Sequence, residues 1–147
     1  MNIASSIFIL RSQIDEALAV APTQGKKELE PFKSLMKAQG VPVIILEDHA
    51  VSDNKVEVHL HQADFWICLE GEATFLVDGE MVEPWQRIRS DGSIDPNEVR
   101  AKNMKNAREI VLRPGDCLWI PAGQPHQHLA TKTARLLILK LPDANRA

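Results

Sequence analysis

The sequence has only two cysteines among its 147 residues, Cys68 and Cys117, and both lie within apolar runs, FWICL and DCLWI. So few cysteines exclude the disulfide framework that holds many small secreted domains together. A cysteine-rich structural zinc site is excluded as well, because neither cysteine has the spacing of a ligand pair. We therefore expect two buried thiols in a reducing compartment.

The sequence also lacks an excess of charge of either sign, with 17 Lys and Arg against 20 Asp and Glu and a net charge of -3. The charges are interspersed, which argues against a basic face for nucleic acid or an anionic membrane. The first ten residues, MNIASSIFIL, have no basic start, and their apolar run is too short to cross a membrane. These absences predict a cytoplasmic protein whose partners include neither nucleic acid nor membrane.

A chain of this length is most simply one domain, and its pattern changes at about residue 40. Within residues 1–40, QIDEALAV predicts a short helix. The stretch PFKSLMKAQ predicts a second helix, because proline suits the first turn and Gly40 suits the stop. We interpret residues 1–40 as a mixed, partly helical arm.

Residues 41–147 have the pattern of short β-strands. The run VPVIIL favours a strand, and the alternation of KVEVHLH places Glu57, His59 and His61 on one face. The stretch DFWICLEGEATFLVDGEMVE predicts three strands joined by two glycine turns, of which the second, at Asp78, is a hairpin signal. More short strands follow to the end of the chain. The series predicts an all-β sandwich or barrel.

One polar, turn-rich stretch interrupts these strands at residues 84–107. Long excursions of this kind often act as lids or binding elements, and the alternative is a tolerated surface insertion. Arg87 and Arg89 within it could bind a substrate carboxylate or phosphate through two hydrogen bonds each. Otherwise they belong to a solvated charged loop.

The histidines are the main chemical signal, since the sequence has no Ser-His-Asp order, glycine-rich phosphate loop or dinucleotide fingerprint. Four of the five histidines lie in two short stretches, HLHQAD and PHQH. In a strand, His59 and His61 point to the same face, as do His126 and His128. Each pair can therefore approach one ion from one side.

Two motifs resemble those of the cupin superfamily. The stretch GDCLWIPAGQPH, from Gly115 to His126, is similar to the second cupin motif, G-x5-P-x-G-x2-H, at every specified position, although Ala130 stands where an Asn is often found. The stretch HLHQADFWICLEGE resembles the first motif, in which HxH and an acidic residue precede a strand that ends at a glycine turn. Together the motifs span nearly all of the expected barrel.

The resemblance implies a single-domain jelly-roll β-barrel, also called a double-stranded β-helix, over residues 41–147. It also implies one divalent metal inside the barrel mouth, held by His59, His61, Asp64 and His126. Imidazoles with one carboxylate suit Fe(II), which we favour, or Mn, Ni, Cu or Zn. Such a ligand set leaves open positions on the metal, as a Lewis-acid or oxygen-activating site needs.

Asp64 stands where the family has Glu when the register is counted back seven residues from Gly71. Because Asp is one methylene shorter than Glu, two roles stay open. Asp64 is either a direct ligand or a carboxylate that orients a histidine.

His128 shares the inward face of His126, and three roles are open for it. It could be a further metal ligand in place of a short Asp64, an acid or base beside the substrate, or a core histidine satisfied by a hydrogen bond. Within an enzyme, His128 or Asp64 would move a proton.

Alternation from Asp64 sends Trp66 and Cys68 to the same inward face. Trp66 and Cys68 would then line an apolar part of the substrate pocket, beside the polar metal site. The alternative for both is an ordinary place in the core, with Cys68 an inert thiol.

These features favour a metal-dependent enzyme acting on a small polar organic molecule, and above all a mononuclear non-haem metal oxygenase of dioxygenase type. One alternative is a metal-dependent sugar or sugar-phosphate isomerase or epimerase, in which proton transfer replaces oxygen chemistry. Another is a cupin that binds or senses a small molecule without catalysis. Fold alone does not choose between them.

A homodimer is the expected assembly, as in the small cupins that the chain resembles. The outward row of Phe65, Ile67 and Leu69 needs cover. The arm of residues 1–40 could supply that cover within the chain or across a dimer.

Overall fold

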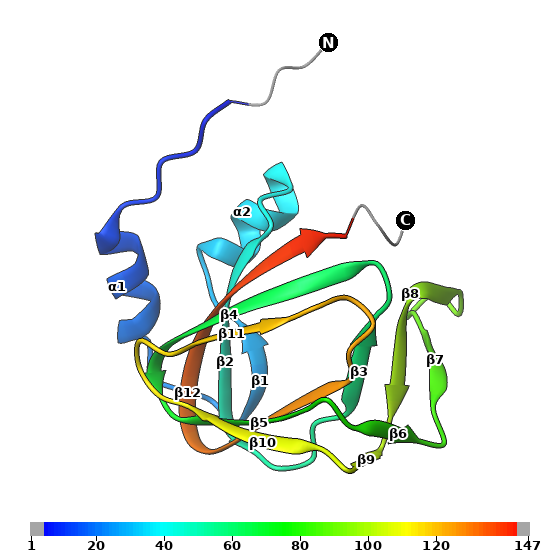
Figure 1. Ribbon diagram of the computed structural model, residues 1–147. Helices are drawn as coiled ribbons and strands as arrows, with labels where there is room; N and C mark the ends of the chain where they lie inside the picture. The colour runs from blue at the N-terminus through cyan, green and yellow to red at the C-terminus, as the bar shows by residue number, and fades with distance from the viewer. Residues whose placement is uncertain (1–4, 144–147) are drawn as a thin grey trace.

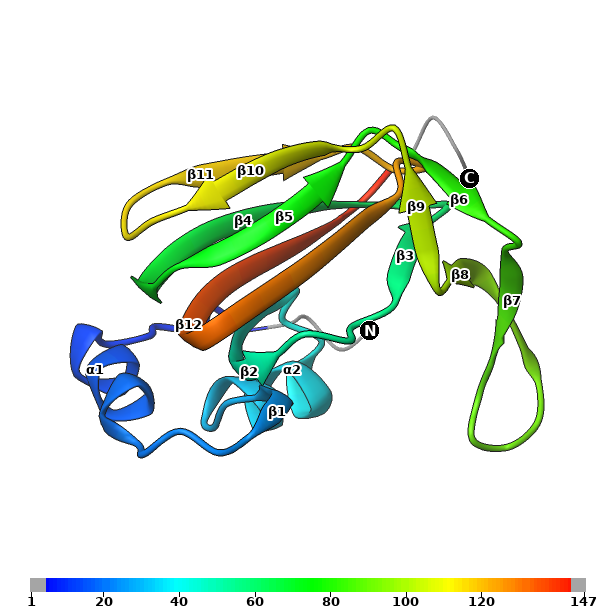
Figure 2. The ribbon, with the colours of Figure 1, turned by 90° about the horizontal axis from the view of Figure 1, so that it is seen from below.

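The computed structural model describes residues 5–143, which form two facing β-sheets with two helices outside one of them (Figures 1 and 2). The elements in chain order are α1 (Arg11–Ala19), β1 (Gly25–Glu28), α2 (Phe32–Gln39), β2 (Val43–Val51), β3 (Val56–His59), β4 (Gln62–Gly71), β5 (Ala73–Val77), β6 (Glu80–Val82), β7 (Trp85–Ile88), β8 (Ile94–Ala101), β9 (Asn103–Lys105), β10 (Arg108–Leu112), β11 (Cys117–Ile120) and β12 (His126–Pro142).

The long strand β12 belongs to both sheets. Its first part, from His126 to Leu129, lies between β5 and β3 in a sheet of order β10-β5-β12-β3-β8-β7. From Ala130 onward it lies between β2 and β4 in a sheet of order β1-β2-β12-β4-β11. All these pairings are antiparallel, and the shared strand closes the two sheets on one another. The predicted all-β jelly-roll barrel is confirmed.

The main core fills the space between the sheets. Trp66, Phe75, Leu112 and Leu136 are almost fully buried there. On β4 the burial alternates, so that Asp64, Trp66 and Cys68 face inward, as the sequence pattern predicts. Burying each large apolar side chain stabilises the fold by about 1.5–3 kcal/mol.

The two helices cover the outer face of the sheet that contains β2 and β4, as Figure 2 shows. Ala17 of α1 and Phe32 of α2 pack with Ile45 of β2, and Leu69 of β4 joins this cluster. The arm therefore supplies cover for Leu69 within the chain. α2 ends at Gly40, whose left-handed backbone (φ 67°) is the expected stop. Neither helix, nor any other helical segment within residues 5–143, is long and apolar enough to span a membrane.

Some elements differ from the sequence pattern. No pattern predicts β1, which adds an edge strand to β2. Residues 84–107 contain β7, β8 and β9, and the hairpin of β7 and β8 projects from the body of the barrel in Figure 2. β5 and β6 flank the turn at Asp78 but do not pair as a hairpin, because β5 pairs with β10 and β12 while β6 pairs with β9.

The predicted glycine turn after β4 is confirmed at Gly71. Its φ is +69°, and a Cβ there would lie 1.8 Å from the carbonyl oxygen of Thr133. Only glycine fits so close to another backbone. This turn carries the chain from one sheet to the other, from β4 into β5.

A buried arginine fastens the arm to the barrel. Nε and Nη2 of Arg135 donate to one carboxylate oxygen of Glu47, at 2.9 and 2.8 Å. The same guanidinium donates to the carbonyl oxygens of Leu18 and Val20, at the end of α1. Arg135 and Glu47 are 4% and 0% exposed. Arg135 also pairs with Glu70 at 3.0 Å and Glu47 with Lys27 at 3.4 Å, so these buried charges are compensated within one small network.

We therefore expect Arg135→Ala to lower the free energy of unfolding by about 3–5 kcal/mol, because it removes two hydrogen bonds to the buried Glu47 carboxylate and those to the carbonyl oxygens of Leu18 and Val20. The matched control is Arg108→Ala, which breaks an exposed ion pair with Asp78 and should cost about 1 kcal/mol or less. Urea denaturation followed by circular dichroism measures both. Equal losses in the two variants would contradict the structural role given to Arg135.

Candidate metal centre

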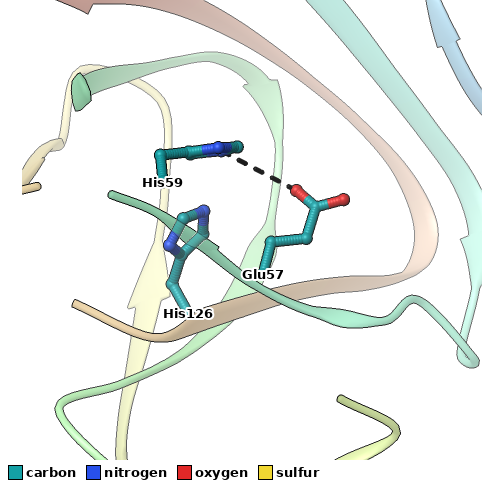
Figure 3. A group of neighbouring side chains, drawn as sticks. All are labelled: Glu57, His59 and His126. Atoms are coloured by element: carbon teal, nitrogen blue, oxygen red, sulfur yellow. Dashed lines mark ion pairs between the residues drawn. The ribbon is translucent and has the colours of Figure 1, made fainter. Parts of the chain in front are cut away.

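Three ligand-type side chains meet inside the mouth of the barrel. Glu57 and His59 extend from the same face of β3, and His126 opens β12 (Figure 3). One potential ligand atom from each lies within 4.8 Å of the other two. The register explains the meeting, because His126 pairs directly with Glu57 across β3 and β12.

Asp64 of β4 joins this cluster from a third strand. Its Oδ2 lies 3.5 Å from Nε2 of His59 and 3.8 Å from Nε2 of His126. Its other oxygen, Oδ1, accepts a hydrogen bond from Nζ of Lys140 at 3.2 Å. Asp64 is 1% exposed, and only one side of its carboxylate is compensated by a lysine.

The buried polar atoms of the cluster that have no hydrogen-bond partner indicate that it fits a divalent metal ion. Among residues 5–143, Oδ2 of Asp64 and Nε2 of His126 are buried and have no hydrogen-bond partner. The distances from Oδ2 of Asp64 to Nε2 of His59 and of His126, 3.5 and 3.8 Å, are longer than those of normal hydrogen bonds. Buried polar atoms of this kind are costly unless something binds them. A cation would satisfy all of them at once.

The protonation states also suit a metal. Burial and the neighbouring His59 lower the pKa of His126 to about 4, and burial lowers the pKa of His59 as well. Burial would raise the pKa of Glu57, but Lys26 and the nearby histidines outweigh it and lower this pKa to about 2. At neutral pH the imidazoles are thus neutral and the Glu57 carboxylate is ionised. Metal ligands need these forms.

His61 lies outside the cluster, because β3 ends at His59 instead of continuing. The amide N–H groups of Leu60 and His61 donate to the carbonyl and side-chain oxygens of Asn97, at 2.7 and 2.8 Å. This bend breaks the alternation that placed His61 beside His59, and His61 is exposed. Instead of His61, it is Glu57, two residues before His59, that shares the inward face of β3 with His59.

His128 is buried with both ring nitrogens occupied. Nδ1 lies 2.5 Å from Oδ2 of Asp48, and Nε2 lies 3.1 Å from Nδ2 of Asn54. Of the three roles considered, this geometry matches the histidine satisfied by hydrogen bonds. Its ring still forms part of the wall beside Trp66, with ring centroids 5.1 Å apart.

A cavity of about 240 Å³ opens onto the cluster. Two of the residues proposed for a substrate pocket, Trp66 and Arg87, line this cavity. Cys68 and Arg89 lie elsewhere. The Cys68 thiol, whose pKa burial raises, donates to the carbonyl oxygen of Glu70, and Arg89 pairs with Asp95 at 3.4 Å.

Sequence reasoning missed several residues of this cavity. The alternation of KVEVHLH contains the signal for Glu57, since it already places Glu57 on the face of His59. No sequence signal points to Glu98 and Arg100, which the register of β8 sets opposite His59 and Glu57. Both lie within the excursion of residues 84–107, which therefore supplies part of the cavity lining.

A model of the JmjC domain family matches residues 22–140, most of the chain. No curated protein matches the chain.

The chain is also similar to several solved structures, of which three follow. A sugar phosphate isomerase of the cupin superfamily from Silicibacter pomeroyi is 20% identical, with a TM-score of 0.48, over 84% of this chain and 67% of that one. Fe(II) HppE is 16% identical, with a TM-score of 0.47, over 67% of this chain and 42% of that one. Hydroxypropylphosphonic acid epoxidase from S. wedmorenis is 17% identical, with a TM-score of 0.47, over the same shares. The chain thus covers about two fifths of the length of the first of these structures, HppE.

The cluster predicts which histidine variants lose metal. We expect His126→Ala to abolish stoichiometric binding of Fe(II) or Ni(II), because it removes a buried nitrogen that has no other partner. The matched control His61→Ala should keep full binding, since His61 lies outside the cluster. Elemental analysis and calorimetric titration of both variants measure this. Loss of metal in His61→Ala would show that His61 is a ligand, as the sequence motif predicts, and would contradict a cluster without it.

The low pKa of His126 predicts acid sensitivity of the metal-free protein. An unfolded histidine titrates near pH 6.5, whereas His126 in the fold titrates at about 4, so the unfolded state binds more protons between these values. The free energy of unfolding should therefore fall as the pH drops from about 6.5 to 4, by roughly 3 kcal/mol from this group. Urea titrations of the wild type and His126→Gln at several pH values test it. If the free energy of unfolding falls with pH as steeply in His126→Gln as in the wild type, groups other than His126 cause the acid sensitivity.

Proposed function

Because the chain belongs to the JmjC domain family of the cupin superfamily, we propose that it is a mononuclear non-haem metal oxygenase acting on a small polar organic substrate. The observation that carries this proposal is the meeting of two neutral histidines with two carboxylates at the mouth of a cavity. Two histidines with a carboxylate, leaving open positions, form the ligand set of non-haem Fe(II) oxygenases.

In this proposal His59 and His126 supply nitrogen ligands from two strands, and Asp64 and Glu57 supply carboxylate oxygens. Donors of this kind suit Fe(II) or Mn(II) better than metals that prefer thiolates. A bound Fe(II) would supply Lewis-acid and redox chemistry at this position. Lys140 holds the second oxygen of Asp64 and so fixes the direction of that carboxylate.

The remaining residues of the cavity would orient the substrate and exclude water. Trp66 and Ile138 form an apolar wall, and Arg87 presents a guanidinium whose Nη1 is held by Glu98 at 2.8 Å. His128 is fixed by Asp48 and Asn54, so we assign it a positioning role in the cavity wall. A fixed wall beside a metal centre is what orientation of a small substrate requires.

The proposal predicts oxygen-dependent turnover. Protein loaded anaerobically with Fe(II) should consume O2 when a panel of small hydroxy acids, keto acids and phenols is added, as recorded with an oxygen electrode and mass spectrometry. His59→Ala should abolish consumption, whereas His61→Ala should retain it, because only His59 belongs to the cluster.

Other results would select the alternatives. Product formation that is unchanged without O2 would favour an isomerase or epimerase. Binding of a compound, seen as a thermal shift without any product, would favour a non-catalytic binding module.

A further inference from the structure

A continuous series of ion pairs runs from the metal cluster into the β7–β8 hairpin. Oε2 of Glu57 lies 3.9 Å from Nε2 of His59, and Oε1 of Glu57 lies 3.5 Å from Nη2 of Arg100. Nε of Arg100 donates to Oε1 of Glu98 at 2.6 Å, and Oε2 of Glu98 accepts from Nη1 of Arg87 at 2.8 Å. Each glutamate thus uses both of its oxygens, one toward each neighbour. We call Glu57, Arg100, Glu98 and Arg87 the cavity network.

The register between β3 and β8 explains how the first part of the cavity network forms. Arg100 lies opposite Glu57, and Glu98 lies opposite His59. Residues directly opposite each other in an antiparallel pair point to the same face of the sheet. All four side chains therefore line the cavity of the metal centre.

The hairpin joins the cavity network at an irregularity in its own pairing. The register of β7 and β8 shifts between Gln86 and Ile88, which places Arg87 at the shift. Such bulges re-aim a side chain. Here Arg87 reaches Glu98 and also lies 3.4 Å from Asp95 of its own hairpin. The hairpin, which projects from the barrel in Figure 2, is therefore tied to the carboxylate at the centre of the network.

Glu98 is the member that holds the network together. It is 6% exposed, so its contacts are only weakly screened by solvent. A buried carboxylate needs cationic partners, and Glu98 has one on each oxygen at charge-assisted hydrogen-bond distances. Its two partners, Arg87 and Arg100, are thereby fixed in direction.

Arg100 bridges two carboxylates with different nitrogens of one rigid group. A planar guanidinium can do this, whereas a lysine ammonium is a single point charge. Lys26 lies 3.7 Å from the same oxygen of Glu57, so it adds charge there without the second anchor on Glu98. Metal ligands are oriented by partners of this kind, and loss of such a partner typically costs about 10–100-fold in metal affinity.

We propose that Arg100 and Glu98 are positioning residues of the metal centre, which hold Glu57 in its ligand orientation and couple it to the β7–β8 hairpin. This inference rests on the proposed function for the metal centre and adds a means of controlling it. A ligand that displaces the hairpin also changes the support of Glu57. Because coupling is reciprocal, metal binding in turn changes the stability of the hairpin position.

The positioning role is tested by Arg100→Lys, which keeps the positive charge but cannot bridge Glu57 and Glu98. The affinity for Ni(II), measured by calorimetric titration, should fall about tenfold or more. The matched control is Arg108→Lys, the same substitution in an exposed ion pair of β10 with Asp78, and it should leave the affinity within about twofold.

The absorption bands of the Co(II)-loaded protein provide a second readout, because they depend on the geometry of the ligands. We expect these bands to shift in Arg100→Lys and to stay unchanged in Arg108→Lys. Glu98→Gln keeps the shape of its side chain and should shift the same bands, so the test does not depend on one variant. Thermal unfolding followed by circular dichroism shows which variants fold.

The coupling to the hairpin is tested by two variants that remove the same charge from it. Arg87→Gln breaks the contact with Glu98, whereas Arg89→Gln breaks an ion pair with Asp95 at 3.4 Å. We expect Ni(II) to bind about threefold or more weakly to Arg87→Gln than to Arg89→Gln. In an Arg100→Lys background Arg87→Gln should have no further effect, because the connection is already broken.

The outcomes separate this inference from the proposed function. Unchanged Ni(II) affinity and Co(II) bands in Arg100→Lys and Glu98→Gln overturn the positioning role, even if the wild type binds metal and consumes O2. Additive effects of Arg87→Gln and Arg100→Lys overturn the coupling to the hairpin. Wild-type protein that takes up no metal overturns the inference together with the metal centre. Metal uptake that depends on Arg100 without any O2 consumption supports the inference and overturns only the oxygenase.

Discussion

The backbone hydrogen bonds of β12 are the constraint on which the rest of this structure depends. This strand pairs with β3 and β5 in one sheet and with β2 and β4 in the other, so it joins the two halves of the barrel. Its register also builds the metal cluster, by setting His126 opposite Glu57 and Lys140 opposite Asp64. A shift of one residue would turn each of these side chains to the other face of its sheet.

The fold of the barrel buries negative charge in the cluster, and the side chains of the cluster do not compensate all of it. Carboxylates such as Asp64 are held away from water beside imidazoles that burial keeps neutral, so the histidines cannot compensate the negative charge as imidazolium ions. Lys140 compensates one oxygen of Asp64 and leaves the other without a donor. A bound cation would compensate this charge and satisfy the buried oxygen that has no donor.

Much of this arrangement is predictable from local pattern. Alternation identified the inward row of Asp64, Trp66 and Cys68, and the spacing of GDCLWIPAGQPH identified a turn and strand that carry His126. The same alternation failed at His61, because a hydrogen-bonded bend with Asn97, distant in sequence, ends β3 two residues earlier. The sequence pattern placed Glu57, His59 and His61 on one face of the strand. In the structure Glu57, and not His61, lies beside His59 in the cluster.

The sequence by itself therefore determined the all-β class, through strand periodicity, and the cupin resemblance, through motif spacing, because both are local properties. It was this resemblance that implied His59, Asp64 and His126 as neighbours. Only the tertiary structure decided that Glu57 replaces His61 in the cluster, that His128 is held by Asp48, and that the polar excursion contributes Glu98 and Arg100. These choices depend on the register between strands far apart in the chain, and register is set by the packing of the whole barrel.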